Sequence, residues 1–364
     1  MADFFEIDFL DVESDKSGDA IGVRDEIGGQ TPIHVVDGGF QDTGESLVAH
    51  IRKYYGAPKR IDHVVATHPD GDHAGGLRRV LEEFEIGALW MLRPWLYAGE
   101  IIGRFENYTS VDNLKKRLKE IYPNIAALEE IANEKKIPIY EPFQGASIGA
   151  FRVMAPSKKR YLDLVVASEK TPEATAEAVK SAGKTLAALL EKAAAKLVTL
   201  VKAAWGVEAF SAEETSAENE MSVVQYALLC GKRVLLTADT GRAGLAEAAD
   251  YAPNVGLVLP GIDRFQVPHH GSRHNVSTEV IDRWLGPRLK EKPVKGKEAF
   301  SALISSAKKD EDHPRKAVVR AMVHRGAAVA STEGKALRTQ MNAPARDGWV
   351  AVTPLDYPEE QEEG

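Results

Sequence analysis

Six consecutive residues carry the side chains best able to do chemistry in this chain, namely His68-Pro69-Asp70-Gly71-Asp72-His73. They offer two imidazoles and two carboxylates directly after a short apolar run at residues 64–66. Because proline and Asp-Gly favour a tight turn, we expect the four side chains to crowd one strand end. Neighbouring carboxylates repel each other unless a bound divalent cation supplies the opposite charge. The spacing therefore predicts a metal site.

Two later segments that read as strands also end in residues that bind metals in proteins. Residues 222–229 and 233–237 are apolar and are joined by Gly231-Lys232, which predicts a hairpin, and the second segment leads into Asp239. Residues 264–267 lead into Pro268-His269-His270-Gly271-Ser272. We expect these strand ends to converge with the first one at a single edge of a sheet, because open α/β folds place their chemistry there.

A third segment, residues 33–36, stops at Asp37-Gly38-Gly39. Two glycines allow the backbone to pass close beneath a site, and Asp37 is suited to orient a metal ligand by hydrogen bonding. Taken alone, the segment is explained as well by an ordinary hairpin or strand-to-helix turn.

Composition narrows the class of protein. The chain has 364 residues, of which 44% are hydrophobic and 27% charged, and no apolar run is long enough to span a bilayer. The net charge of −8 argues against a large nucleic-acid surface but is compatible with a local basic groove. Cys230 is the only cysteine, so metal ligands must come from histidine and carboxylate. The acidic start lacks the features of a signal peptide, and we expect a cytoplasmic protein without a membrane partner.

Hydrophobic periodicity predicts an alternation of strands and helices. The strands are expected over residues 4–12, 20–24, 33–36, 61–67, 88–95, 137–140, 151–154, 222–229, 233–237, 264–267, 302–305 and 327–330. The helices are expected over residues 46–55, 74–84, 97–136, 277–284 and 315–325.

With these motifs in place, the chain resembles the metallo-β-lactamase-fold hydrolases. It looks most like the hydrolase domain of the ComEC-type competence proteins and their free-standing relatives. The resemblance rests on the metal motif at 68–73, Asp37-Gly38-Gly39, Gly18-Asp19-Ala20, Thr237-Ala238-Asp239, the segment 267–272, and Ser305, His313-Pro314 and Thr332-Glu333-Gly334 near the end. It implies an α/β fold, a metallo-β-lactamase-like αββα sandwich with helical insertions.

The resemblance also implies a two-metal site. His68 and Asp70 would bind one ion, Asp72 and His73 the other, with Asp239 bridging and His270, or as the less favoured alternative His269, completing the second site. A metal-bridging hydroxide would attack the substrate, oriented by Asp72. His269, together with Ser272, would grip the leaving group or a phosphate oxygen.

The chain departs from the superfamily at the third motif, which usually carries a histidine. Only Glu218, Asn219 and Glu220 stand there, so Asn219 or Glu218 is at most a weak first-site ligand. The carboxylate-rich set shifts the expected metal from zinc toward manganese, with zinc retained as an alternative. The transmembrane channel that accompanies the uptake proteins is absent, which argues against a role in DNA uptake.

The domain organisation follows from these assignments. We expect a first half of the sandwich at 1–156 with a helical insertion near 97–136, a second insertion at 157–212, a second half at 213–355 and an acidic tail at 356–364 that is disordered from Glu359. The second insertion is rich in Ala, Lys and Glu, and its leucines, up to Leu200 and Val201, fall at helical spacing. It is expected to pack on its own domain, or to serve as a lid or as the arm of a homodimer.

Three functions fit this pattern. The first is a phosphodiesterase or nuclease. The second is a hydrolase of a small ester, lactone or thioester. The third is a metal-binding module without turnover. The acidic net charge favours small substrates over long DNA, and nucleic acid is compatible but not required.

Overall fold

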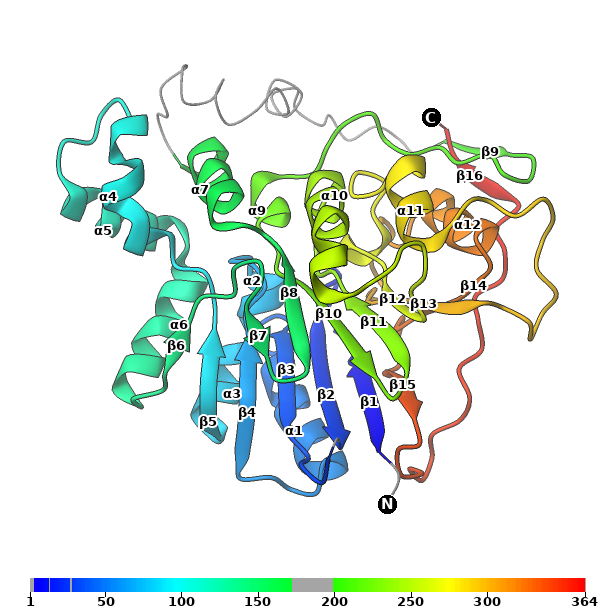
Figure 1. Cartoon of the computed structure of the whole chain (residues 1–364), viewed down its shortest axis with the longest axis horizontal. Coiled ribbons are helices and arrows are strands. Elements are labelled where there is room, and N and C mark those ends of the chain that lie inside the picture. Colours follow the sequence, from blue (N-terminus) through cyan, green and yellow to red (C-terminus); the bar gives the residue numbers. More distant parts are fainter. Residues whose placement is uncertain (1–2, 13, 27, 172–198, 364) are drawn as a thin grey trace.

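The computed structural model describes residues 3–12, 14–26, 28–171 and 199–363. Two seven-stranded sheets lie face to face, with helices on their outer sides (Figure 1). The α/β sandwich expected from the sequence is therefore confirmed.

The first sheet is mixed, with order β15-β1-β2-β3-β4-β5-β6. Its strands are β1 (Phe4–Phe9), β2 (Ala20–Glu26), β3 (Ile33–Gly38), β4 (Arg60–Val65), β5 (Glu85–Trp90), β6 (Ile139–Tyr140) and β15 (Leu337–Met341). Strands β3 to β6 run parallel, and the pairs from β15 to β3 are antiparallel.

The second sheet has the order β14-β13-β12-β11-β10-β8-β7. Its strands are β7 (Ser147–Ile148), β8 (Phe151–Ala155), β10 (Val224–Leu229), β11 (Lys232–Leu236), β12 (Arg264–Gln266), β13 (Phe300–Ile304) and β14 (Ala327–Ser331). Strands β10 and β11 form the antiparallel hairpin expected around Gly231, and β11 to β14 run parallel.

Helices cover the outer faces of both sheets. The helices are α1 (Thr43–Tyr54), α2 (Gly71–Ala74), α3 (Leu77–Glu83), α4 (Ala98–Ile101), α5 (Val111–Ile121), α6 (Pro123–Glu134), α7 (Lys158–Ala167), α9 (Ala217–Glu220), α10 (Arg242–Tyr251), α11 (Thr278–Leu285) and α12 (Lys316–His324). Short 3-10 turns are η1 (Pro94–Tyr97), η2 (Ile102–Arg104), η4 (Ala252–Val255) and η5 (His269–Gly271). Helices α1 and α3 pack on the first sheet, and α10 and α12 on the second.

Serine caps explain where several helices begin. The hydroxyls of Ser110, Ser157 and Ser277 each accept a hydrogen bond from a backbone amide in the first turn of α5, α7 and α11. Such a bond satisfies an amide that has no carbonyl partner at a helix start. The helical segment expected over residues 97–136 is present as η1, α4, η2, α5 and α6.

The second predicted insertion and the tail differ from expectation. Leu200 and Val201 belong to β9 (Leu200–Lys202), not to a helix, and β9 pairs with β16 (Glu360–Glu362) in the acidic tail. The tail is ordered because Gln361 and Glu362 are buried and Glu362 accepts hydrogen bonds from the first backbone amides of α12. The helices predicted between residues 172 and 198 lie outside the described residues.

None of the helices in the described part of the chain combines the length and hydrophobicity that a membrane crossing requires.

Candidate metal centre

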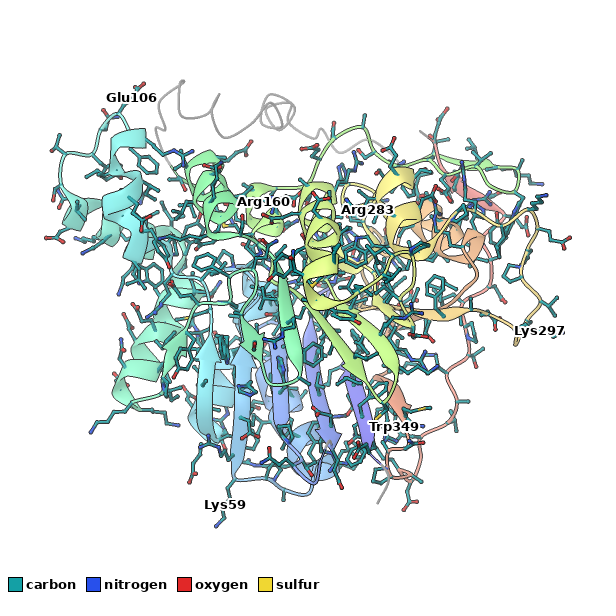
Figure 2. All side chains as sticks on the ribbon, viewed as in Figure 1. Lys59, Glu106, Arg160, Arg283, Lys297 and Trp349 are labelled. Carbon is teal, nitrogen blue, oxygen red and sulfur yellow. The ribbon has the colours of Figure 1, made fainter. Side chains whose placement is uncertain are left out.

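The residues singled out in the sequence lie in loops at the carboxyl ends of strands from both sheets. The metal motif follows β4 and opens α2, Asp239 follows β11, and the two histidines of η5 follow β12. These loops meet where the two sheets face each other, so each sheet supplies part of the site. Figure 2 shows how densely side chains fill the space between the sheets and the helices above them.

Glycines allow these loops to approach. A Cβ on Gly18 would lie 2.5 Å from the carbonyl oxygen of Asp72, and one on Gly76 would lie 2.0 Å from the carbonyl oxygen of Gly38. Any side chain at either position would push the metal motif away from the neighbouring loops. The glycines of Asp37-Gly38-Gly39 and of Gly75-Gly76 thus both allow the backbones of two loops to pack against each other.

Four imidazoles surround the buried carboxylate of Asp239. Its Oδ1 lies 3.2 Å from His73 Nε2 and 3.7 Å from His270 Nε2. Its Oδ2 lies 3.6 Å from His269 Nε2 and 3.9 Å from His68 Nε2. The structure therefore brings Asp239 and all four histidines together.

Each ring presents Nε2 to the centre because Nδ1 is engaged on the other side. His73 Nδ1 lies 2.8 Å from Asp37 Oδ2, and His270 Nδ1 lies 2.9 Å from the carbonyl oxygen of Ser305. Both partners are acceptors, so Nδ1 carries the proton and donates. Such hydrogen bonds fix the ring orientation and tautomer of metal-binding histidines.

His68 is held in the same way through Thr67. The Thr67 hydroxyl donates to Asp37 Oδ2 over 2.6 Å, which leaves its oxygen to accept from His68 Nδ1 at 3.1 Å. Asp37 also accepts from the Thr67 backbone amide over 2.9 Å. One carboxylate thus orients two imidazoles, directly for His73 and through Thr67 for His68.

The inward-facing atoms suit a cation. Within the described residues, Asp239 Oδ1 and the Nε2 atoms of His68, His73 and His270 are buried and have no hydrogen-bond partner. With neutral rings they are electron-pair donors that face one another, an arrangement that buried groups avoid unless protons on the rings or a cation between them supplies positive charge. One oxygen or nitrogen from each of Asp72, His73, Asp239 and His270 lies within 4.8 Å of the others.

Electrostatics agree with this interpretation. Burial raises the pKa of Asp239, but the imidazoles of His73, His269 and His270 outweigh burial and hold that pKa well below its usual range. Burial lowers the pKa of His270, yet Asp239 and Asp72 together raise it to about 9. For His73, Asp239 and Asp37 likewise overcome burial and raise the pKa well above its usual value. The carboxylates thus retain protons on the rings where a metal ion would displace them.

Asp72 and Asp70 occupy different environments. Asp72 Oδ2 lies 3.9 Å from both His73 Nε2 and His270 Nε2. Burial raises the pKa of Asp72, but His73 and His270 outweigh it and bring the pKa to about 2. Asp70, predicted on the first metal, instead pairs with the Lys170 ammonium over 2.7 Å and is absent from the clustered groups.

The third-motif residues are engaged by other side chains and by backbone amides. Glu218 accepts from the Ser168 hydroxyl, and Glu220 pairs with Arg160, labelled in Figure 2, and with backbone amides at the start of α10. Asn219 donates to Thr215 Oγ1 over 2.7 Å. Both predicted weak ligands, Asn219 and Glu218, thus have protein partners of their own.

Ser272, predicted to grip the leaving group, is buried. Its Oγ accepts from the backbone amide of His274, and its own amide donates to the carbonyl of His269. These contacts stabilise the loop.

Two residues that sequence reasoning did not assign to the site lie in it. Asp19 Oδ2 lies 3.8 Å from His73 Nδ1 and accepts from Gln266 Nε2 over 2.7 Å, and burial raises its pKa. Asn275 is buried and contacts His269. Asp19 had a signal in Gly18-Asp19-Ala20, whereas Asn275 had none beyond its position six residues after His269.

Several residues at the site adopt left-handed backbone conformations that side chains disfavour. Asp37, Ala238, His269 and His270 have φ values of 57°, 46°, 47° and 55°. Each such conformation costs roughly 1 kcal/mol or more and persists where the surroundings impose it, often at functional sites.

Comparison with known proteins agrees with the architecture. Residues 27–116, about a quarter of the chain, match the model of the metallo-beta-lactamase superfamily, and this range contains both the Asp37 turn and the metal motif. No curated protein sequence matches the chain.

Among solved structures, a mutant of the CmlA beta-hydroxylase aligns with a TM-score of 0.38 and 11% identity over 93% of this chain and 53% of that one. CmlA itself, a diiron beta-hydroxylase from Streptomyces venezuelae, aligns with a TM-score of 0.30 and 12% identity over 71% of this chain and 33% of that one. The present chain thus spans about half the length of the mutant CmlA chain and a third of the length of the other CmlA chain.

Proposed function

We propose that this chain is a metal-dependent hydrolase of the metallo-β-lactamase superfamily that cleaves phosphodiesters, and that its closest functional relatives are the ComEC-type hydrolase domains. The observation that carries the proposal is the ring of inward-facing Nε2 atoms around Asp239, each held by a hydrogen bond on its far side. This arrangement supports a centre for two divalent ions bridged by one carboxylate.

The residues divide between two positions. Asp72, His73 and His270 would hold one ion with Asp239 Oδ1, and His68 would hold the other with Asp239 Oδ2. In a centre of this kind, a pair of divalent ions lowers the pKa of water toward neutrality and balances the negative charge that builds on the phosphoryl oxygens. The assigned set combines the imidazoles of His68, His73 and His270 with the carboxylates of Asp72 and Asp239, which suits zinc as well as manganese.

The chain's own side chains supply the remaining functions. Asp72 is more exposed than the other clustered residues and can accept a hydrogen bond from an attacking water molecule. Lys170 lies at the rim beside Asp70 and is half exposed, so its ammonium is available to a phosphate oxygen. Burial lowers the pKa of Lys170, but Asp70 outweighs burial and raises it, so the group is a cation at neutral pH.

The net charge of −8 bears on substrate size. A long duplex would be repelled by most of the surface, whereas a small phosphodiester or a short single strand contacts only the rim of the site. We therefore expect small or single-stranded phosphodiesters to be preferred.

A panel of substrates tests the proposal. Protein loaded with Mn²⁺ or Zn²⁺ is assayed against bis-p-nitrophenyl phosphate, single-stranded DNA and a simple lactone, each over a series of salt concentrations. Turnover of the phosphodiester is the expected result, and a steep fall with salt on DNA would identify nucleic acid as the substrate. Lactone turnover alone would favour the small-ester hydrolase, and bound metal without any turnover would favour a binding module.

A further inference from the structure

The first of the two proposed metal positions lacks a ligand from the third motif, and His269 lies where a ligand is needed. His269 Nε2 is 3.6 Å from Asp239 Oδ2, the same oxygen that faces His68 Nε2. The other oxygen faces His73 and His270. Each oxygen of the Asp239 carboxylate therefore faces a different pair of imidazoles.

The orientation of the His269 ring is fixed by Asn275. The Asn275 amide nitrogen donates to the backbone carbonyls of Asp239, over 2.7 Å, and Thr240, over 3.3 Å. These bonds determine which end of the amide faces His269, and it is the oxygen, 2.9 Å from His269 Nδ1. Nδ1 therefore carries the proton, and Nε2 presents its lone pair toward Asp239.

The backbone aims both histidines at the same carboxylate. His269, His270 and Gly271 have successive positive φ values of 47°, 55° and 86°. The His269 amide donates to the carbonyl of Ala238, which ties this turn to the loop that carries Asp239. A left-handed turn of this kind is unfavourable for two imidazole-bearing residues and turns both rings inward.

The third motif also contacts His269. The Asn219 amide nitrogen lies 3.2 Å from His269 Nδ1. Because Nδ1 donates to Asn275, this is a packing contact and not a hydrogen bond. The residue that stands where the superfamily has a histidine ligand thus contacts the ring that faces the metal position. Asp70, the other expected first-site ligand, is engaged by Lys170.

We propose that His269 Nε2 is a ligand of the first metal ion, alongside His68 and Asp239, and that it replaces the histidine missing from the third motif. The inference rests on the two-metal centre of the proposed function but not on its substrate. It differs from the role in which His269 grips the leaving group, because a nitrogen that binds a cation has no proton to donate.

Manganese EPR spectroscopy combined with metal analysis tests this assignment. Wild-type protein loaded with Mn²⁺ and desalted is expected to retain two equivalents and to show the exchange-coupled spectrum of neighbouring ions. His269→Gln should retain one equivalent with the spectrum of an isolated ion, because loss of a direct ligand should weaken the first position by more than the roughly 10- to 100-fold that loss of an outer hydrogen-bond partner costs. His313→Gln is the matched control: its ring lies 5.5 Å from that of His269, but its Nδ1 faces Asp310, so two coupled ions should remain.

Two coupled ions in His269→Gln would overturn the assignment. Should that variant fail to fold, a crystal structure of Mn²⁺-loaded wild-type protein decides the question: an anomalous peak at bonding distance from His269 Nε2 supports the proposal, and a first ion bound by Asn219 or Glu218 instead refutes it. Wild-type protein that binds fewer than two ions would refute both the centre and the inference. Two bound ions without phosphodiester turnover would refute only the proposed substrate.

Discussion

Asp239 is the single residue on which most of the site depends. It is buried, and four imidazole nitrogens lie between 3.2 and 3.9 Å from its two oxygens. A carboxylate with both oxygens engaged in this way holds two positive groups at once. The same charge in a dry interior without cations or protons around it would be strongly destabilising.

Asp239→Asn is expected to abolish turnover and to lower the metal content, because an amide nitrogen would replace one of the oxygens and remove the charge. We expect metal affinity to fall by more than the roughly 10- to 100-fold that loss of a ligand's hydrogen-bond partner costs. Metal analysis after dialysis and the phosphodiester assay measure the two effects. Asp250→Asn, at an exposed acid of α10 paired with Arg283, is the control. Full activity with full metal content in Asp239→Asn would disprove the bridging role.

At the scale of elements, strand β3 carries a histidine that destabilises the protein in acid. His34 is buried on β3 and packs edge-on against Phe151, with ring centroids 5.1 Å apart. Burial, with a smaller contribution from His63, lowers the pKa of His34 to about 3. In an unfolded chain the pKa of this group is about 6.5. Below that pH the unfolded state therefore binds a proton that the folded state does not bind until the pH approaches 3.

Stability should therefore fall as the pH drops from 7 to 5, and His34 alone should account for about 2 kcal/mol of that fall. His34→Phe, which does not titrate, should show a smaller loss over this range. Urea unfolding at both pH values measures the difference between the two proteins. Equal losses in wild-type and variant protein would contradict the assigned pKa.

Helix α12 depends on the tail of the chain for its N-terminal cap. The Glu362 carboxylate accepts hydrogen bonds from the backbone amides of Lys316 and Ala317 over 2.8 and 2.9 Å. These amides have no carbonyl partner within the helix, and a negative charge there also interacts favourably with the helix dipole. The cap explains why an acidic tail is ordered on this surface.

Glu362→Ala should lower the free energy of unfolding by about 1 to 2 kcal/mol, because two backbone amides at the start of α12, one of them buried, lose their acceptor. Denaturant unfolding measures the loss, with Glu360→Ala on the same strand as the control. An unchanged midpoint for Glu362→Ala would show that water replaces the carboxylate without penalty.

At the scale of the whole molecule, the candidate centre joins the two sheets. The first sheet contributes His68, Asp72 and His73, and the second contributes Asp239 and His270. Ions bound to residues of both sheets would thus link the two halves of the sandwich. Without metal, the two halves lack this link at the centre.

Loading with Mn²⁺ or Zn²⁺ should raise the midpoint of thermal unfolding, and a chelator should reverse the effect. A ligand at 100 times its Kd, bound only to the folded state, stabilises a protein by about 2.7 kcal/mol. Calorimetry with and without the chelator measures the shift. The Asp239→Asn protein should show little shift, and an equal shift in both proteins would place the stabilising ion elsewhere.

Much of the fold could be predicted because its signals are local. The short apolar runs that became β3, β4, β10 and β11 are bounded by turn residues, and the hairpin at Gly231 needs only its own neighbours. The segments that were misjudged are those whose state depends on distant partners. Leu200 and Val201 have helical spacing but pair with the tail, and the tail is held by that pairing and by the hydrogen bonds of Glu362 to α12.

The sequence alone was sufficient to identify the groups that could bind a cation, since imidazoles and carboxylates clustered after apolar runs are recognisable without coordinates. It was also sufficient for most strands and helices, because periodicity and turn chemistry act over a few residues, and the resemblance carried by the motifs implied the sandwich. Only the tertiary structure decided how these groups are divided between the two proposed metal positions. Which side of Asp239 each histidine faces, and that Asp70 turns to Lys170, depend on loops from both sheets and on hydrogen bonds between residues far apart in the chain.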